Sequence, residues 1–386
     1  MKVIFFHDNI ITVKNQNLYS SGGLNEKVIS RYLSISSKFS LGSRNDDTRV
    51  IDTLSFVGTL DEVEFHKIPN LAGLSIKKIR IASRILSEVI DENDFIIIRL
   101  PSIIGLLALF ITKKKKKNYL IELVGCPWDS YRLHSVKGKI IALPMFLLTK
   151  FFIKNADHVL YVTNNFLQNR YPTKSKKQMG CSDVELLIEE GVLENKLSKL
   201  DLGEKGRKIK IGMIGFIEAK YKGFDTAIMA LSLLKKKKQL NYNLEIVGGG
   251  NSEYLEKLIK KYNVTECVTL IGVLSHPKGI FNWLDSIDIY LQPSKTEGLP
   301  RALIEAMGRS CACIGANSGE IPQLLESKYI HEKGSFKKLS ELIIEISKDN
   351  NIRSSARNNF IRAQQYDKKI LDERRELFYK QCMGSI

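Results

Sequence analysis

The sequence predicts an α/β protein with two successive doubly wound domains. Short apolar runs of strand length alternate with longer helical stretches in both halves of the 386-residue chain. This alternation is typical of parallel sheets with helices on both faces. A polar stretch that contains two glycines, Glu194–Lys208, lies between the halves and is interpreted as a linker. A chain of this length can build a core on each side of it.

Near-continuous apolar runs predict the strands of the first half, because a strand covered on both faces has no polar face. They are Val3–Asp8, Phe95–Leu100, Tyr119–Val124 and His158–Thr163. The helices expected around them are Leu24–Ile35, Ile76–Ile90, Ile103–Ile111 and Ile140–Ala156. These elements predict a first domain over residues 1–200.

The alternation begins again after the polar stretch. Strands are expected at 209–214, 244–247, 268–274, 287–293 and 311–316. Helices are expected at 225–238, 252–263 and 300–308, the last opened by Pro300, which suits a first helical turn. The second domain is predicted to cover residues 201–365, and polar helices are expected in the stretch 354–383.

The chain is strongly basic, with 59 Lys and Arg against 42 Asp and Glu, a net charge of +17. Residues 95–182 hold 15 of the basic and 3 of the acidic residues, a net of +12, and include the run Lys113–Lys117. Because apolar segments Ile103–Ile111 and Ile140–Ile153 lie in the same region, we expect it to contact an anionic membrane surface. The alternative is that both segments are core helices. No zinc, RRM or KH pattern supports a nucleic-acid partner.

The six cysteines form no C-x-x-C pair and are interpreted as buried hydrophobes of a reducing compartment. No stretch reaches the roughly 20 apolar residues of a spanning helix, and the apolar run of MKVIFFHDN is short for a signal peptide. A cytoplasmic protein, peripheral on the inner face of the membrane, is therefore expected.

Two glycine turns directly follow strands of the second half. Gly215 ends the run IKIGMIG, and Gly248–Gly250 follow LEIV. Parallel α/β sheets bind ligands beyond the carboxyl ends of their strands, and glycines there let the backbone approach a phosphate closely. Since Lys222 lies in the first turn, at the start of a predicted helix, we expect its ammonium group to meet a diphosphate.

The segment KTEGLPRALIEAMGRS carries two glutamates, Glu297 and Glu305, separated by seven residues. Glu297 is expected in the loop after a strand, and Glu305 among apolar neighbours in the helix that follows. Two carboxylates at one edge of a sheet suit a ligand with several hydroxyl groups, because each carboxylate can accept more than one hydrogen bond. The backbone amides of Gly298 and Leu299 can meet phosphate oxygens.

In this order, these motifs resemble the donor-binding domain of the family 4 glycosyltransferases, which are retaining enzymes of the GT-B fold. The resemblance spans most of the second half and rests on Lys222–Gly223, IVGGG at Ile246–Gly250, VTLIGVL at Val268–Leu274, the E-x7-E pattern in EGLPRALIE and SGEIPQLL at Ser318–Leu325. The first half is similar to the acceptor domain of the family in SSGGLNEKV at Ser21–Val28 and in Asn155–Pro172. The resemblance implies two Rossmann-like domains facing each other across a cleft. It also implies that residues 366–386 form a helix that crosses back to the first domain.

The resemblance also implies a role for each motif residue. Lys222 would bind the donor diphosphate, and Glu297 would hold hydroxyls of the transferred sugar; these two are the expected catalytic residues. The further donor-binding residues are Gly22, Gly23, Gly215, Lys220, Gly248, Gly249, Val273, Leu274, Gly298, Leu299 and Glu305. Glu305 would bind the ribose, Val273 and Leu274 would lie near the base, and Gly22 and Gly23 would approach the phosphates from the first domain. No cofactor or catalytic metal is expected, because lysines and helix N-termini can carry the charge of the leaving group.

Three positions depart from the family pattern. Phe216 stands where an arginine is common, and Lys220 is the expected substitute. Gln323 replaces a usual glutamate, and ELVGCPWDS has no histidine at the end of its strand. On the acceptor side we therefore consider His7, Trp128 and Asp129.

The expected function is retaining transfer of a sugar from a nucleotide-diphosphate sugar to an acceptor hydroxyl. The resemblance favours a lipid-linked glycan of bacterial surface polysaccharide as the acceptor, and a soluble acceptor remains the alternative. A nicotinamide-dependent oxidoreductase is less favoured, because no G-x-G-x-x-G follows the first strand.

Overall fold

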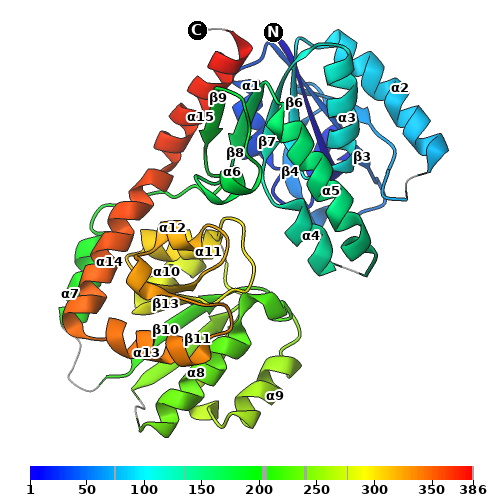
Figure 1. Cartoon of the computed structure of the whole chain (residues 1–386). Helices are drawn as coiled ribbons and strands as arrows, with labels where there is room; N and C mark the ends of the chain where they lie inside the picture. The colour runs from blue at the N-terminus through cyan, green and yellow to red at the C-terminus, as the bar shows by residue number, and fades with distance from the viewer. Residues whose placement is uncertain (74, 135, 202–206, 239–240, 276, 385–386) are drawn as a thin grey trace. The chain divides into compact units, whose positions relative to one another are not determined.

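A computed structural model of the protein describes residues 1–73, 75–134, 136–201, 207–238, 241–275 and 277–384 (Figure 1). The chain divides into two compact units. Unit 1 holds Met1–Asp183 together with Asp372–Ile386, and unit 2 holds Val184–Leu371. Each unit is a sheet with helices on both of its faces, which confirms the predicted fold class.

Nine strands form one sheet across the described residues of unit 1, and the order along its main path is β4-β2-β1-β6-β7-β8-β9. The strands are β1 (Lys2–Lys14), β2 (Asn17–Ser20), β3 (Lys38–Asn45), β4 (Ser55–Thr59), β5 (Val63–Lys67), β6 (Phe95–Leu100), β7 (Asn118–Leu123), β8 (His158–Tyr161) and β9 (Lys177–Gly180). The helices are α1 (Glu26–Leu33), α2 (Ile76–Glu92), α3 (Ile103–Lys114), α4 (Pro127–His134), α5 (Val136–Lys154), α6 (Phe166–Arg170) and α15 (Lys368–Met383).

Successive side chains of β1 point to opposite faces of the sheet, and both faces are buried. Ile4 and Phe6 belong to a core that also contains residues of α2, α3, α5 and α6. Phe5 points the other way, with its ring centroid 5.0 Å from that of Tyr32 on α1, and Tyr32 lies 6.0 Å from Tyr379 on α15. Both layers are therefore apolar, which explains the continuous apolar runs in the sequence.

A buried carboxylate ties α15 to unit 1. Glu122 on β7 accepts hydrogen bonds from the hydroxyl groups of Tyr32 (2.9 Å) and Tyr379 (2.6 Å) and forms an ion pair with Arg99 on β6 (2.9 Å). Arg375 on α15 donates to the carbonyl oxygen of Ser182 at 2.6 Å. The helix predicted at the end of the chain thus packs on unit 1, although its sequence follows unit 2.

Six strands form the sheet of unit 2 within its described residues, all parallel and in the order β12-β11-β10-β13-β14-β15. The strands are β10 (Ile209–Ile214), β11 (Tyr242–Val247), β12 (Val268–Gly272), β13 (Ile289–Gln292), β14 (Ala312–Ala316) and β15 (Ile330–His331). The helices are α7 (Val192–Asp201), α8 (Phe224–Lys236), α9 (Glu253–Lys261), α10 (Lys278–Ser286), α11 (Arg301–Gly308), α12 (Ile321–Leu324), α13 (Phe336–Ile346) and α14 (Asp349–Ala363). One core packs against α8 and α13, and a second packs against α10, α11 and α12.

The boundary between the units differs from the predicted 200/201. The division falls at Asp183/Val184, and the first part of the predicted linker is helix α7. Lys196 of α7 is buried, and its ammonium group donates to the carbonyl oxygens of Leu284 (2.9 Å) and Ile287 (2.7 Å). A polar, lysine-rich stretch therefore joins unit 2 through a buried lysine. Residues 202–206 of the predicted linker lie outside the described residues.

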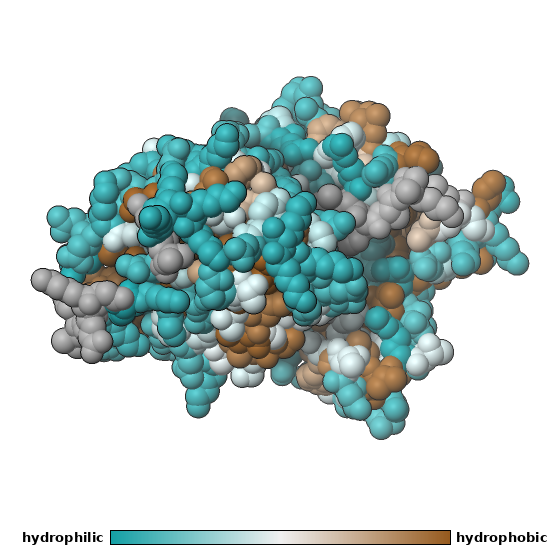
Figure 2. Space-filling model, turned by 90° about the horizontal axis from the view of Figure 1, so that it is seen from below, coloured by the Kyte–Doolittle hydropathy of each residue, from teal (hydrophilic) through white to brown (hydrophobic). Residues whose placement is uncertain are grey.

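All six cysteines are buried free thiols, as expected of small hydrophobes. In the part of the chain that the structure describes, no helix combines the length and the apolar composition needed to cross a membrane. Figure 2 shows one face of the molecule, on which hydrophilic residues prevail and smaller hydrophobic areas lie between them.

Candidate active site

The predicted donor-site residues of unit 2 lie in the loops that follow β10, β11, β12 and β13, except Glu305, which lies on α11. These strands are parallel neighbours, so their carboxyl ends share one edge of the sheet. Loops at this edge are where open α/β sheets bind ligands. The structure therefore brings together at this edge the residues that the motifs singled out.

Lys222 and Glu297 form an ion pair at this edge, although 75 positions separate them in the sequence. The ammonium group of Lys222 lies 2.8 Å from Oε1 of Glu297, and the side chains are 21% and 9% exposed. The same oxygen accepts a hydrogen bond from the Gln292 side-chain amide at 2.8 Å. The Gln292 carbonyl oxygen in turn accepts from the Tyr290 hydroxyl group at 3.1 Å.

Tyr290 and Gln292 were not among the predicted residues. Both are buried on β13. Tyr290 orients the side chain of Gln292, and Gln292 holds the carboxylate of Glu297 in place. Burial and the nearby charges of Glu305 and Glu297 raise the pKa of Tyr290 far above its usual value, so its hydroxyl stays a hydrogen-bond donor. The signal in the sequence was the polar Gln292 at the end of the strand IYLQ, after Ile289, Tyr290 and Leu291.

Glycines allow the two strand-end loops to approach each other closely. Gly223 has a φ of +78°, and a Cβ atom there would collide with the carbonyl oxygen of Pro293. A Cβ atom at Gly248 would collide with the carbonyl oxygen of Gly215. At Gly215, a Cβ atom would lie only 3.1 Å from the side chain of Lys222. These glycines therefore allow the loops to pack closely beside the lysine.

Two further contacts brace the loop that carries Lys222. The backbone amide of Lys295 donates to the carbonyl oxygen of Tyr221 at 2.7 Å. The Lys295 ammonium group pairs with Asp225 at 2.6 Å. Both link the loop after β13 to the start of α8, and sequence patterns gave no sign of them because the partners lie about 70 residues apart.

Gly298 and Leu299 precede α11, as predicted, and are half-buried. The amide of Glu320 donates to the carbonyl oxygen of Gly298 at 3.0 Å, so the SGE segment supports this loop. Gly319 has a φ of +56° and lies against the backbone of Glu297. Glu305 is buried on α11, as expected for a carboxylate among apolar neighbours.

The predicted base-binding residues lie beside the second glycine turn. A Cβ atom at Gly249 would lie 3.1 Å from the side chain of Val273, which is largely exposed. Leu274 packs against the core of unit 2. Phe216, at the place of the common arginine, is exposed. The Lys220 ammonium group lies 5.1 Å from the ring centroid of Tyr254 on α9.

Gly22 and Gly23 belong to unit 1 and follow β2. β1 continues past its parallel part and turns back as the antiparallel hairpin β1–β2, in which Ser20 pairs with Ile11. Gly22 has a φ of +104°, and a Cβ atom at either glycine would meet no atom within 4 Å. Their role at the donor phosphates stays a prediction.

His7 is half-buried in β1, and its Nδ1 lies 2.7 Å from the Asn9 side-chain oxygen. Burial and the charge of Arg99 lower the pKa of His7 from 6.5 to about 4, so this imidazole is neutral at neutral pH. The adjacent Asp8 accepts from the amides of Ile103 (2.6 Å) and Ile104 (3.0 Å), and caps α3. His7 can therefore act as a neutral hydrogen-bonding group, while Asp8 has a structural role.

Trp128 and Asp129 lie on α4 of unit 1. The Trp128 ring makes an edge contact with Phe146 at 6.3 Å, and Asp129 pairs with Arg170 at 3.3 Å. Both side chains thus have packing partners inside unit 1, and their role toward an acceptor stays a prediction. Among the described residues, no cluster of His, Cys, Asp and Glu could hold a metal ion.

The comparisons with known proteins agree with this geometry. A sequence model of the family "Glycosyl transferases group 1" matches residues 195–365. Protein CapJ of Staphylococcus aureus is 35% identical over 348 residues, 89% of this chain and 85% of CapJ. The S. aureus capsular polysaccharide biosynthesis glycosyltransferase CapM is 24% identical, over 67% of each chain. Anabaena HepE in complex with UDP has a similar structure over the whole of both chains, with a TM-score of 0.68 at 15% identity.

Residues 195–365 of the family match include the Lys222–Glu297 pair, the glycine turns and α11. The structural likeness covers both units, which identifies the fold as GT-B. The chain therefore belongs to the group 1 glycosyl transferases and is a glycosyltransferase of the GT-B fold.

Proposed function

We propose that the enzyme transfers a sugar from a nucleotide-diphosphate sugar to a glycan hydroxyl group with retention at the anomeric carbon. We further propose that the acceptor is a lipid-linked glycan in the synthesis of a bacterial surface polysaccharide. The name of CapM, capsular polysaccharide biosynthesis glycosyltransferase, supports this process. The UDP bound to HepE supports a nucleotide donor.

The observation that carries the proposal is the chain of contacts from Tyr290 through Gln292 and Glu297 to Lys222. Among the residues that the structure describes, both hydrogen bonds to the Glu297 carboxylate reach Oε1. Oε2 is therefore available for a sugar hydroxyl group. Lys222 uses one of its three N–H groups in this pair, so it can hold a diphosphate oxygen while keeping its bond to Glu297.

In this proposal Lys222 acts mainly when the bond to the sugar breaks. Charge grows on the diphosphate as it leaves, and a fixed ammonium group stabilises that charge more strongly than the charge of the bound donor. The amides of Gly298 and Leu299, next to the N-terminus of α11, add partial positive charge. The acceptor hydroxyl group then attacks the face from which the diphosphate departs, and a diphosphate oxygen takes its proton.

Lys220 does not replace the missing arginine in this proposal, because its ammonium group lies over the ring of Tyr254. The diphosphate would be held by one lysine and by backbone amides. Binding should therefore depend on salt less steeply than in a site with two cations.

The first experiment measures which ligands stabilise the protein. Melting temperatures are compared with a panel of nucleoside diphosphates, their sugars and NADH, since a ligand that binds only the folded state raises the melting temperature. A nucleotide sugar should stabilise the protein, and Lys222→Ala should remove most of that effect. Lys257→Ala is the matched control, because Lys257 forms an exposed pair with Glu253 on α9. Stabilisation by NADH alone would instead favour an oxidoreductase.

The second experiment identifies the acceptor and the stereochemistry. The enzyme is incubated with a radiolabelled nucleotide sugar and membranes of a polysaccharide-producing strain, and the label is partitioned between organic and aqueous phases. Label in the organic phase supports a lipid-linked acceptor, and label only in the aqueous phase supports a soluble one. Proton coupling constants of the product show whether the anomeric configuration is retained.

A further inference from the structure

Helix α5 presents an apolar face to solvent. Its exposed hydrophobic residues are Ile140, Leu143, Leu147, Leu148 and Phe151, with exposed fractions between 46% and 74%. Their spacing of three and four residues places them on one side of a helix. The opposite side, with Met145, Phe152 and Ile153, is buried in the core of unit 1. The outward face of α5 is thus apolar where a surface helix is normally polar.

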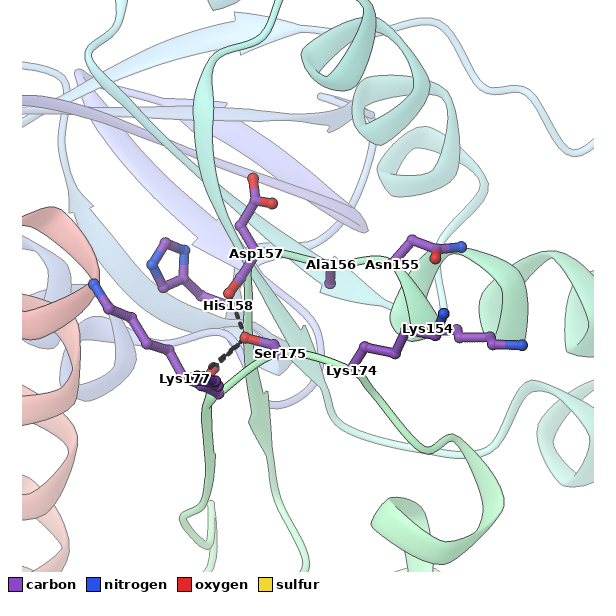
Figure 3. Close-up of a pocket in the computed structure, with 9 residues that line it drawn as sticks. Lys154, Asn155, Ala156, Asp157, His158, Lys174, Ser175 and Lys177 are labelled. Atoms are coloured by element: carbon purple, nitrogen blue, oxygen red, sulfur yellow. Dashed lines mark hydrogen bonds between the residues drawn. The ribbon is translucent and has the colours of Figure 1, made fainter.

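Positive charge surrounds this apolar face. The sequence of α5, VKGKIIALPMFLLTKFFIK, contains no acidic residue, and Lys139, Lys150 and Lys154 are exposed. At its C-terminal end the helix adjoins a hollow of about 520 Å³ whose charged lining residues are four lysines and one aspartate, namely Lys154, Lys174, Lys176, Lys177 and Asp157 (Figure 3). Apolar side chains flanked by lysines are the composition of helices that lie in a membrane interface.

Two other features suggested a membrane contact, the segment Ile103–Ile111 and the run Lys113–Lys117, and both have contacts inside unit 1. The segment Ile103–Ile111 belongs to α3, which contributes Ile104, Leu106, Ala108 and Leu109 to the core of unit 1 and leaves Phe110 exposed. This segment therefore fits the alternative of a core helix. Within the run Lys113–Lys117, Lys113 donates to the carbonyl oxygen of Asn155 at 2.8 Å and Lys117 to that of Asp91 at 2.8 Å, and Lys115 pairs with Asp91. The apolar contact therefore rests on α5.

We propose that the outward face of α5 docks unit 1 on an anionic lipid bilayer, with the helix parallel to the membrane plane. Ile140, Leu143, Leu147, Leu148 and Phe151 enter the headgroup region, and the flanking lysines meet lipid phosphates. The proposal concerns the surface of unit 1 and uses no residue of the donor site. It holds for a soluble or a lipid-linked acceptor, so its failure is distinct from a failure of the proposed function.

Charge favours a membrane over a second copy of the chain as the occupant of this face. The chain carries a net charge of +17, and α5 offers no carboxylate to pair with the lysines of another copy. A two-fold contact through α5 would therefore bring the lysines of the helix against those of the other copy, with no carboxylate on either helix to pair with them. An anionic bilayer supplies both an apolar interior and the opposite charge.

The test is sedimentation of the full chain with vesicles of phosphatidylcholine alone and of phosphatidylcholine mixed with phosphatidylglycerol. The variant Leu147→Gln/Phe151→Gln removes apolar area from the face of α5, and glutamine keeps a helix-forming residue at both positions. The matched control is Ile361→Gln/Leu377→Gln, because these two exposed residues lie on α14 and α15. Circular dichroism and melting curves check that each variant is folded.

The wild type and the control should bind the mixed vesicles, and binding should weaken as salt rises. Partition of the α5 variant into vesicles should fall about tenfold for each apolar side chain lost. Lys150→Gln should lower partition about fivefold, since one cation near an anionic surface contributes that much. Binding of nucleotide sugar by the α5 variant should equal that of the wild type.

Three outcomes would overturn the proposal. The first is no binding of the wild type to mixed vesicles at low salt. The second is equal binding by wild type and α5 variant. The third is a dimer in sedimentation velocity that Leu147→Gln/Phe151→Gln dissociates, which would assign the face to a second copy of the chain.

Discussion

Lys222 and Glu297 should behave as one unit in stability and in ligand binding. Removing both side chains should cost less than the sum of the two single losses, because each single variant leaves a charge without its partner. The Lys222–Glu297 pair is mostly buried, with an N–O distance of 2.8 Å, and Gln292 supports it. A hydrogen bond to a charged group contributes about 1.5–3 kcal/mol, so we expect a coupling energy of that size.

The exposed pair Lys257–Glu253 on α9 gives a reference value for the coupling energy. Its side chains are 72% and 65% exposed, and an exposed pair four residues apart on a helix contributes only about 0.3–0.5 kcal/mol. Double-mutant cycles to alanine on both pairs are measured by urea unfolding. Trp283 lies in unit 2, so its fluorescence in a Trp128→Phe background follows the unfolding of that unit.

Ligand binding separates the expected role of Lys222 at the diphosphate from that of Glu297 at the sugar. With the nucleoside diphosphate alone, Lys222→Ala should raise Kd about tenfold to a hundredfold. Glu297→Ala should leave Kd for the diphosphate unchanged or lower it, since it removes a negative charge, and should weaken binding of the intact nucleotide sugar. A coupling energy no larger than that of the α9 pair, or equal effects of Glu297→Ala on both ligands, would refute this account of the site.

Three further predictions concern single positions. Glu305→Ala should abolish most sugar transfer while circular dichroism shows the fold unchanged; wild-type turnover would remove Glu305 from the site. His7 is neutral in the folded protein, with a pKa of about 4 against 6.5 in the unfolded chain. The unfolded chain therefore binds more protons between these pH values, and the unfolding free energy should fall as pH drops from 6.5 toward 4. The slope of unfolding free energy against pH should be shallower in His7→Asn, and identical slopes in the two proteins would contradict the lowered pKa. Tyr379→Phe removes a buried hydrogen bond to Glu122. It should therefore lower the unfolding free energy by about 1.5–3 kcal/mol and speed amide hydrogen exchange in α15. The control is Tyr254→Phe, at an exposed tyrosine of α9, which should change neither quantity.

The sequence predicted the parts of the fold that have a continuous apolar signal. The strand at Phe95–Leu100 has the predicted ends, and β10 and α11 lie where expected. β3 and β5 were not predicted, because KFSLGSRN and VEFHK mix polar and apolar residues and so lack the continuous apolar signal of the other strands. The prediction of a linker at α7 was wrong, because the local sequence cannot distinguish the buried Lys196 from a solvated lysine.

The candidate site likewise contains residues that local sequence patterns predict and residues that they do not. Glycine turns and the two glutamates follow from local spacing, because turn geometry and helix position depend on neighbours in the chain. The bonds of Gln292 and Tyr290 and the displacement of Lys220 toward Tyr254 depend on side-chain packing between segments far apart in the sequence. No local pattern records such contacts.

The buried carboxylate of Glu122 has a consequence for synthesis of the chain. Tyr379 and Arg375 leave the ribosome after all of unit 2, yet they satisfy buried groups of unit 1. Until then, Glu122 keeps its bonds to Tyr32 and Arg99 but lacks the Tyr379 hydroxyl group, and the carbonyl group of Ser182 lacks Arg375. Each missing buried hydrogen bond lowers the stability of unit 1. Vectorial folding of unit 1 should therefore stop at an open intermediate, and its completion should wait for residues translated nearly 200 positions later.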